Sequence, residues 1–404
     1  MTPTTPGGAL LRATTTRRRT GITASLRTLG LVLGGLALAS CAAPAGSTNT
    51  GPTLSPGSGS LDLAAVCPAT VVVQSAWTPE AEHGALYHLL SQTYTIDEQK
   101  KKVSGPLVAE GKDTGVMIEI RAGGPAIGFQ NAGAQMYADP SIMLGQVATD
   151  DAIGLSAKQP VVAVVAPFDI APYMIMWDPA AHPEFHSIVD IGKSNTTVLY
   201  FNGATYMEYL TGSGILKRSQ VDGSYDGSPA RFLSEKGKVA QQGFATNEPF
   251  IYEKAIDAWK KPVQFQLIHD TNYPIYPEAI VVRADKKAEY AACLTRLVPI
   301  IQRSQVAYVG NPTATNGLII KLNDAYKGFP YSKEQAAFSV SQQLKLKIVG
   351  NGSNATLGDF ETDRIKRVID IVGPIYTGQR KEIKTELKPQ DLFTNEFIDT
   401  SIGL

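Results

Sequence analysis

The chain has few cysteines, few charges and few long apolar runs. Only three of its 404 residues are cysteine, and no Cys-x-x-Cys or Cys/His spacing typical of a metal site is present. Charged residues make up 18% of the chain and hydrophobic residues 43%, which excludes an acidic disordered chain and a basic nucleic-acid binder. Beyond residue 40, no apolar run approaches the ~20 residues of a spanning helix, so the sequence excludes wholesale membrane embedding.

The formal net charge is zero, but the basic residues are unevenly distributed. Residues 1–40 contain five arginines and no acidic residue. Removing these five from the 37 basic residues leaves 32 against 37 acidic residues, a net charge of −5. A mildly acidic body of this length favours two lobes with a large core, and it argues against DNA or an anionic membrane surface as the main partner.

The first 40 residues are typical of an export signal. Arg17–Arg19 precede the short apolar stretch 29–38, and small residues follow it. The segment Leu38-Ala39-Ser40-Cys41 resembles a bacterial lipobox, which implies cleavage before Cys41 and its diacylation. We therefore expect a protein anchored to the outer face of the cell membrane by its lipidated Cys41. An ordinary signal peptide with an incidental cysteine is the alternative, and export by Sec or by Tat stays open.

The segment after the lipobox is expected to be a flexible tether, residues 41–66. Residues 42–60 hold Leu54 as their only large apolar side chain, so little surface can be buried there. Cys67 and Cys293 are the two cysteines left beside Cys41. In an oxidising compartment this pair favours a disulfide over two separate buried thiols.

The remaining sequence alternates strand and helix patterns. Val71–Trp77, Val161–Val165, Tyr173–Trp177 and Ala279–Arg283 are expected to be strands, and the chain from Lys286 onward is largely helical in pattern. This alternation predicts an α/β fold with two lobes, the second inserted in the first. The expected division is lobe 1 from 67 to 170, lobe 2 from 171 to 275, and completion of lobe 1 with C-terminal helices from 276 to 404.

Ligands of open α/β sheets bind beyond the carboxyl ends of strands, where loops and helix N-termini converge. This rule selects a set of candidate ligand-binding residues without any family information. They are Trp77, Glu80, His83, Thr149, Asp150, Phe168, Asn202, Thr205, Tyr206, Asn247, Glu248 and Tyr273.

Several of these residues have a purely structural alternative. Trp77 could belong to the core, and His83 could be an exposed helix residue. Thr149 and Asp150 could serve only to cap a helix beginning at Asp150. Asn202 could form only a turn with the glycine after it, and Glu248 could be a first-turn acid favoured by the helix dipole.

Short motifs in a characteristic order carry a family resemblance. They are Trp77-Thr78-Pro79, His83-Gly84, Thr149-Asp150-Asp151, Asp190–Lys193 with Tyr200–Gly203, and Asn247-Glu248-Pro249. Together they resemble solute-binding proteins of the nitrate/sulfonate/taurine ABC importers, including the NMT1/THI5-like group. The resemblance implies a type II periplasmic-binding-protein fold with hinge crossovers. It also implies a monomer that is no enzyme and that delivers its solute to a permease and ATPase. Glu80 departs from the family pattern, where Asn is common.

The candidate loops contain aromatic and acidic residues but no arginine. Such a set favours a flat nitrogen heterocycle, neutral or cationic, such as a thiamine-precursor pyrimidine. Binding of a sulfonate, taurine or nitrate is the alternative, because helix N-termini can hold an anion. A solute-sensing lipoprotein would use the same residues. A pyrimidine-biosynthesis enzyme is disfavoured because the Cys-rich stretch of that branch is missing. No cofactor, metal or nucleic acid is expected.

Overall fold

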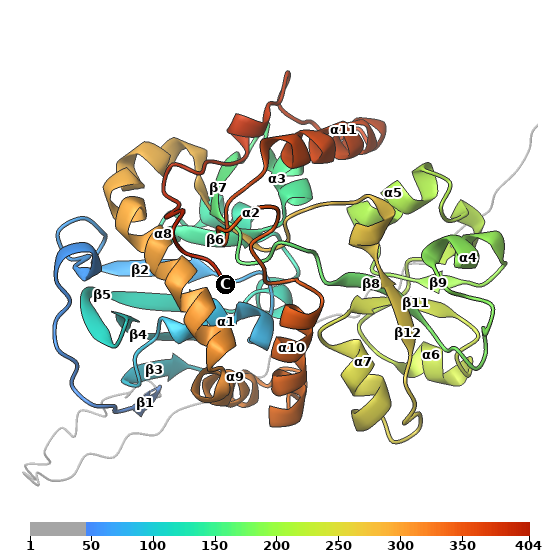
Figure 1. Ribbon diagram of the computed structural model, residues 1–404, viewed down its shortest axis with the longest axis horizontal. Helices are drawn as coiled ribbons and strands as arrows, with labels where there is room; N and C mark the ends of the chain where they lie inside the picture. The colour runs from blue at the N-terminus through green and yellow to red at the C-terminus, as the bar shows by residue number, and fades with distance from the viewer. Residues whose placement is uncertain (1–45) are drawn as a thin grey trace, which may run out of the picture. The chain divides into compact units, whose positions relative to one another are not determined.

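Two β-sheets run through residues 46–404, the part of the chain that the computed structural model describes (Figure 1). The expected export signal and Cys41 lie outside these residues. Within residues 46–404, no helix combines the length and the apolar character needed to cross a bilayer.

The larger sheet belongs to lobe 1 and has the order β1-β3-β4-β5-β2-β6-β13-β7. The strand β2 is parallel to both of its neighbours, β5 and β6, whereas β13 is antiparallel to β6 and β7. The bounds are β1 Ser47–Asn49, β2 Thr70–Gln74, β3 Tyr94–Asp97, β4 Lys102–Ala109, β5 Lys112–Arg121, β6 Leu144–Val147, β7 Val161–Val165 and β13 Ala279–Arg283.

The smaller sheet, in lobe 2, repeats this pattern in the order β10-β9-β11-β8-β12. The strand β9 is parallel to β10 and β11, and β8 is antiparallel to β11 and β12. In each lobe, the antiparallel strand is the first one after the chain crosses from the other lobe. The bounds are β8 Tyr173–Trp177, β9 Val198–Leu199, β10 Val221–Asp222, β11 Ala240–Phe244 and β12 Gln264–Leu267.

The chain crosses between the sheets twice, through residues 166–172 and 272–278. Arg364 binds both crossings: its Nη1 lies 2.6 Å from Asp169 Oδ1, and its Nε donates to the carbonyl of Pro274 at 2.7 Å. Two sheets of matching order joined by two crossings confirm the expected two-lobed α/β fold class.

Helices cover both sheets (Figure 1). Those of lobe 1 are α1 Gly84–His88, α2 Ala132–Ala138, α3 Thr149–Leu155, α8 Lys287–Gly310, α9 Thr313–Tyr326, α10 Lys333–Lys345 and α11 Thr362–Gly378. Those of lobe 2 are α4 Ile188–Lys193, α5 Thr205–Gly212, α6 Ala230–Ser234 and α7 Glu248–Phe250, which continues as a π-helical turn over Ile251–Ala255. A 3₁₀ turn, Ala81–His83, precedes α1.

The expected flexible tether is wrong for residues 47–66. Ser47–Asn49 form β1 and pair with β3, and the Gly57 N–H donates to the carbonyl of Asp113 at 2.6 Å. Leu63 is fully buried in the core of lobe 1. Backbone pairing at a sheet edge does not depend on apolar side chains, so the polar composition of this segment did not reveal it.

The disulfide expected between Cys67 and Cys293 is present in the structure. It joins the segment before β2 to α8 across 226 residues of chain, with the two Cα atoms 4.7 Å apart. The first and last parts of lobe 1 are therefore covalently linked.

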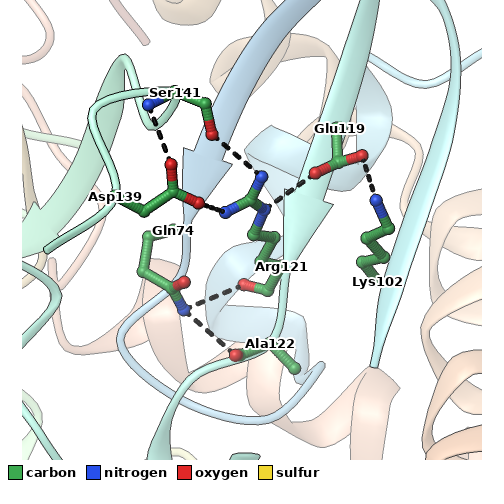
Figure 2. Close-up of polar contacts among 7 residues, drawn as sticks. All are labelled: Gln74, Lys102, Glu119, Arg121, Ala122, Asp139 and Ser141. Atoms are coloured by element: carbon green, nitrogen blue, oxygen red, sulfur yellow. Dashed lines mark hydrogen bonds and ion pairs between the residues drawn. The ribbon is translucent and has the colours of Figure 1, made fainter. Parts of the chain in front are cut away.

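A polar network fixes the carboxyl end of β5 next to β2 (Figure 2). Arg121 donates to Glu119 Oε1 at 2.7 Å, to Asp139 Oδ2 at 2.6 Å and to the hydroxyl of Ser141 at 3.2 Å. The buried amide of Gln74 donates to the carbonyl of Ala122 at 3.0 Å. These bonds hold the strand ends from which the loops of the candidate site emerge.

Candidate ligand-binding site

The candidate site is centred on an ion pair between His83 and Glu278 in lobe 1. The His83 Nε2 and Glu278 Oε2 atoms are 3.3 Å apart, and the His83 side chain is almost fully buried. Gln146, in β6, donates to Glu278 Oε2 at 3.5 Å and accepts a hydrogen bond from the Ser75 hydroxyl at 2.8 Å. The ends of β2 and β6 and the start of β13 therefore meet at this ion pair.

The backbone of Glu278 has a φ of 50°, in the left-handed region. For a residue with a side chain this conformation costs on the order of 1–3 kcal/mol, and it persists only where the surroundings fix it. It places the Glu278 carboxylate beside His83.

Three more carboxylates surround this pair. We call Glu80, Glu82, Glu248 and Glu278 the carboxylate cluster; Glu248 comes from lobe 2 and the others come from lobe 1. Burial raises the pKa of Glu80 well above its ordinary value, and the charges of the other three raise it further. The four carboxylates therefore form one electrostatic unit that spans both lobes.

Burial and mutual repulsion disfavour ionisation of these acids. Burial, together with the charge of Glu82, raises the pKa of Glu248 to about 7, even though the Phe244 N–H donates to its Oε2 at 2.6 Å. Burial alone would lower the pKa of His83, but Glu278, Glu80 and Glu82 outweigh it and raise this pKa to about 9. At neutral pH the cluster therefore holds a charged histidine beside carboxyl groups whose ionisation burial disfavours.

Glu82 faces Thr246 of lobe 2. Burial raises the pKa of Glu82, and the nearby Thr246 hydroxyl offsets part of that rise. Glu82 is 5% exposed and Thr246 is fully buried, yet neither Glu82 Oε2 nor Thr246 Oγ1 has a hydrogen-bond partner within residues 46–404. Buried polar atoms are normally satisfied, so these two atoms require an explanation.

Aromatic side chains from lobe 2 border the cluster. The ring of Tyr173 lies 5.7 Å from that of Tyr206 and 5.1 Å from that of Phe244, measured between centroids. Burial raises the pKa of Tyr173 well above its ordinary value, and the charges of Asp150 and Glu278 in lobe 1 add to the rise. The phenol of Tyr173 therefore faces the acids of lobe 1.

On the lobe 1 side, Trp77 packs against Phe129, with ring centroids 5.7 Å apart. Phe129 is 66% exposed and has a φ of 59°. Trp77 itself is half-buried rather than part of the closed core.

The structure gives Thr149, Asp150 and Tyr273 a role between α3 and the second crossing. Thr149 does not cap its helix: the helix begins at Thr149, and its hydroxyl accepts a hydrogen bond from the Tyr276 N–H at 3.0 Å. The phenol of Tyr273 donates to Asp150 Oδ2 at 2.7 Å, and both side chains are buried. The expected cap is therefore wrong, because the Thr149 hydroxyl accepts its hydrogen bond from the second crossing and not from its own helix.

Three other expected residues lie away from the carboxylate cluster. Phe168 is 1% exposed and belongs to the core of lobe 1, and Asn202 is exposed at a turn. The Thr205 hydroxyl is hydrogen-bonded at 3.1 Å to the phenol of Tyr376 in α11. Core packing holds Phe168 and a hydrogen bond holds Thr205 away from the cluster, whereas Asn202 faces solvent.

Asn247 lies where the two lobes touch. Its Oδ1 accepts a hydrogen bond from Gln335 Nε2 of α10 at 2.5 Å, and Phe250 packs against Phe338 of α10 with centroids 5.6 Å apart. On the opposite flank, α11 packs against α5. The lobes therefore contact each other on both sides of the cluster.

Sequence reasoning missed Glu82, Glu278, Tyr173 and Phe244. The carboxyl-end rule applies to parallel strands, whereas β8 and β13 are antiparallel to their neighbours. Their amino ends therefore face the site, and Tyr173 and Glu278 stand at those ends. Tyr173 and Glu278 each lie at the end of a crossing between the lobes. That position is the feature from which the sequence could have indicated them.

Comparison with solved structures identifies the fold. Neither the sequence models of known families nor the sequences of curated proteins match this chain. A protein from Bordetella bronchiseptica RB50 is similar with a TM-score of 0.50 and 14% identity, over 82% of this chain and 96% of that one. The alkanesulfonate-binding protein SsuA of Xanthomonas axonopodis pv. citri, bound to MOPS, gives a TM-score of 0.50 at 9% identity, over 81% of this chain and 98% of that one. Residues 46–404 thus adopt the two-lobed periplasmic-binding-protein fold.

Proposed function

We propose that the chain is the extracytoplasmic solute-binding lipoprotein of an ABC importer. It binds one small solute between its lobes and passes it, unchanged, to a permease. The observation that carries this proposal is the carboxylate cluster, in which side chains from both lobes converge beside aromatic rings. A site shared in this way is filled and completed by lobe closure.

The charge of the site favours a nitrogen heterocycle as the solute. Four carboxyl groups beside one histidine offer a sulfonate or nitrate few hydrogen-bond donors. A bound cation favours the ionised forms of these groups, which then accept hydrogen bonds from its ring or amino N–H groups. Trp77, Tyr173 and Tyr206 offer flat surfaces for a ring. A thiamine-precursor pyrimidine has this chemistry and a flat ring, whereas an alkanesulfonate or nitrate has neither.

Closure would bend the two crossings. Arg364 fixes Asp169 and Pro274 to α11 on the lobe 1 side, so the bend falls between these residues and lobe 2. The contacts of α10 and α11 with lobe 2 form as the lobes close, and solute binding shifts the equilibrium toward this state. The permease then recognises the closed lobes.

A lipid anchor at Cys41 would hold the protein outside the membrane. The lipobox-like Leu38–Cys41 supports this part of the proposal. Replacing Cys41 by alanine should move the protein from the membrane fraction to the soluble fraction of the cell envelope. Retention of Cys41→Ala in the membrane fraction would contradict lipidation at this residue.

The solute class is tested by thermal shift of the purified protein against thiamine precursors, nucleobases, flavins, taurine, alkanesulfonates and nitrate. A solute that binds only the folded state raises the melting midpoint. We expect a shift with a nitrogen heterocycle and recovery of that compound unchanged. A shift with sulfonates alone would keep a binding protein but contradict the proposed solute, and silence across the panel would count against the function.

A further inference from the structure

In and beside the carboxylate cluster, several buried polar atoms lack a hydrogen-bond partner within residues 46–404, among them Glu82 Oε2, Thr246 Oγ1 and His83 Nδ1. Glu82 Oε2 in lobe 1 and Thr246 Oγ1 in lobe 2 lack a hydrogen-bond partner within residues 46–404, although both side chains are more than nine-tenths buried. A buried donor or acceptor without a partner costs about 1–3 kcal/mol, more if it is charged. A bound group that satisfies both atoms would recover that energy.

The charges around these atoms define what the missing group must be. Glu82 raises the pKa of Glu80 in its own lobe and of Glu248 in the other lobe, so it lies close to both carboxylates. His83 is the one cation among the groups that act most strongly on Glu80. The charges of Glu80 or Glu82 also raise the pKa values of three phenols, those of Tyr87, Tyr308 and Tyr331.

We propose that Glu82, Thr246 and Glu248 form a subsite for a positively charged nitrogen group of the solute, such as an amidinium or a protonated ring nitrogen. This inference rests on the proposed function and deepens it. The charged group donates hydrogen bonds to the carboxylates of Glu82 and Glu248 and to the hydroxyl oxygen of Thr246. It therefore bridges the lobes.

The subsite also explains how the solute controls closure. Without a cation, burial and the charge repulsion between Glu82 and Glu248 disfavour the ionised forms of both carboxyl groups at the interface between the lobes. A cation between them turns this repulsion into attraction on both sides. The rings of Tyr173 and Tyr206 nearby suit an organic cation with a flat body.

Three monosubstituted benzenes test the charge requirement: benzamidine as the cation, benzamide as its neutral isostere and benzenesulfonate as the anion. Melting midpoints and affinities are measured for the wild type, Glu82→Gln and Thr246→Val. Glu98→Gln is the matched control, because Glu98 is an exposed acid of lobe 1. We expect benzamidine to bind tightest and benzenesulfonate to give no shift.

Glu82→Gln should weaken benzamidine binding by about 10- to 100-fold, the usual worth of a charge-assisted hydrogen bond. It should leave benzamide binding nearly unchanged, and Glu98→Gln should bind benzamidine like the wild type. Thr246→Val, which keeps the side-chain shape, should weaken benzamidine less than Glu82→Gln does. Thr246→Val also keeps the test valid if Glu82→Gln fails to fold.

Three outcomes would contradict the subsite. Benzamide could bind as tightly as benzamidine, benzenesulfonate could bind more tightly than benzamidine, or both variants could bind benzamidine with unchanged affinity. If benzamidine does not raise the melting midpoint while another solute of the wider panel does, the subsite is wrong and the proposed binding function stands. An unchanged melting midpoint with the three probes and with the whole panel would count against both the subsite and the proposed function.

Discussion

The Glu278 side chain shows how one residue organises the site. Its backbone occupies the left-handed region, and its carboxylate lies against a buried histidine. Burial by itself disfavours a charged imidazole, so the charged form of His83 depends on this neighbour. The pair is stable only while both members are present.

Glu278→Gln should lower the pKa of His83 from about 9, because the largest favourable charge is lost while burial remains. In the wild type, a folded-state pKa above the ordinary value of 6.5 means that the charge of His83 stabilises the fold below pH 6.5. That contribution is lost as pH rises through about 9. Titration of the His83 ring by NMR measures this, with Glu98→Gln as control. An unchanged titration in Glu278→Gln would contradict the ion pair.

At the scale of single residues, the sequence selected some of the residues in and beside the carboxylate cluster. Glu80, His83 and Glu248 follow strands and do join the cluster. Phe168 and Thr205 satisfy the same rule but lie elsewhere. Phe168 packs in the core of lobe 1, and the Thr205 hydroxyl is hydrogen-bonded to a phenol of α11. Glu278 was missed because the rule concerns carboxyl ends, and the direction of a strand depends on long-range pairing that spacing does not encode.

Among the elements, α10 connects the two lobes through two side-chain contacts. Its Gln335 is buried and donates to Asn247 of lobe 2, and its Phe338 packs on Phe250. The helix belongs to lobe 1 by chain order and by its packing against α9. In the proposed closed state, α10 therefore holds the two lobes together, and we call it the latch helix.

Gln335→Ala should weaken solute binding by about 2- to 10-fold, because a net hydrogen bond of about 0.5–1.5 kcal/mol is lost from the closed state. The Ser332 cap of α10 is unaffected, since it accepts from the Gln335 backbone N–H. Calorimetric titration with the solute found in the panel measures the change. Ser341→Ala, on the exposed face of the same helix, is the control, and equal affinities in the two variants would contradict the role of the latch helix.

Element prediction succeeded where strands are buried on both faces. The sequence placed Val161–Val165, Tyr173–Trp177 and Ala279–Arg283 with the bounds that the structure has. It missed β1, β3 and β4, whose pairing joins distant segments at the edge of the sheet. Over residues 81–88, a 3₁₀ turn leads into α1, which packs against α8. Gly84 permits this close packing, because a Cβ there would meet the ring of Tyr308 at 2.0 Å.

For the whole molecule, the disulfide links the beginning of lobe 1 to its helical completion. Its loop spans 226 residues, so the bond restricts a large part of the unfolded chain. Cys67→Ser should lower the free energy of unfolding by about 2–5 kcal/mol. Denaturant unfolding measures the change, and a reductant should destabilise the wild type but not the variant. Identical unfolding curves would contradict a stabilising bond.

The central claim is that a solute binds between the lobes, and hydrogen–deuterium exchange tests it most directly. The exchange of the purified protein is compared with and without the solute that raises its melting midpoint most. We predict simultaneous protection of residues 77–83 and 278–281 in lobe 1 and of residues 173–177 and 242–248 in lobe 2. Protection confined to one lobe, or located on the outer surface away from the carboxylate cluster, would contradict the account.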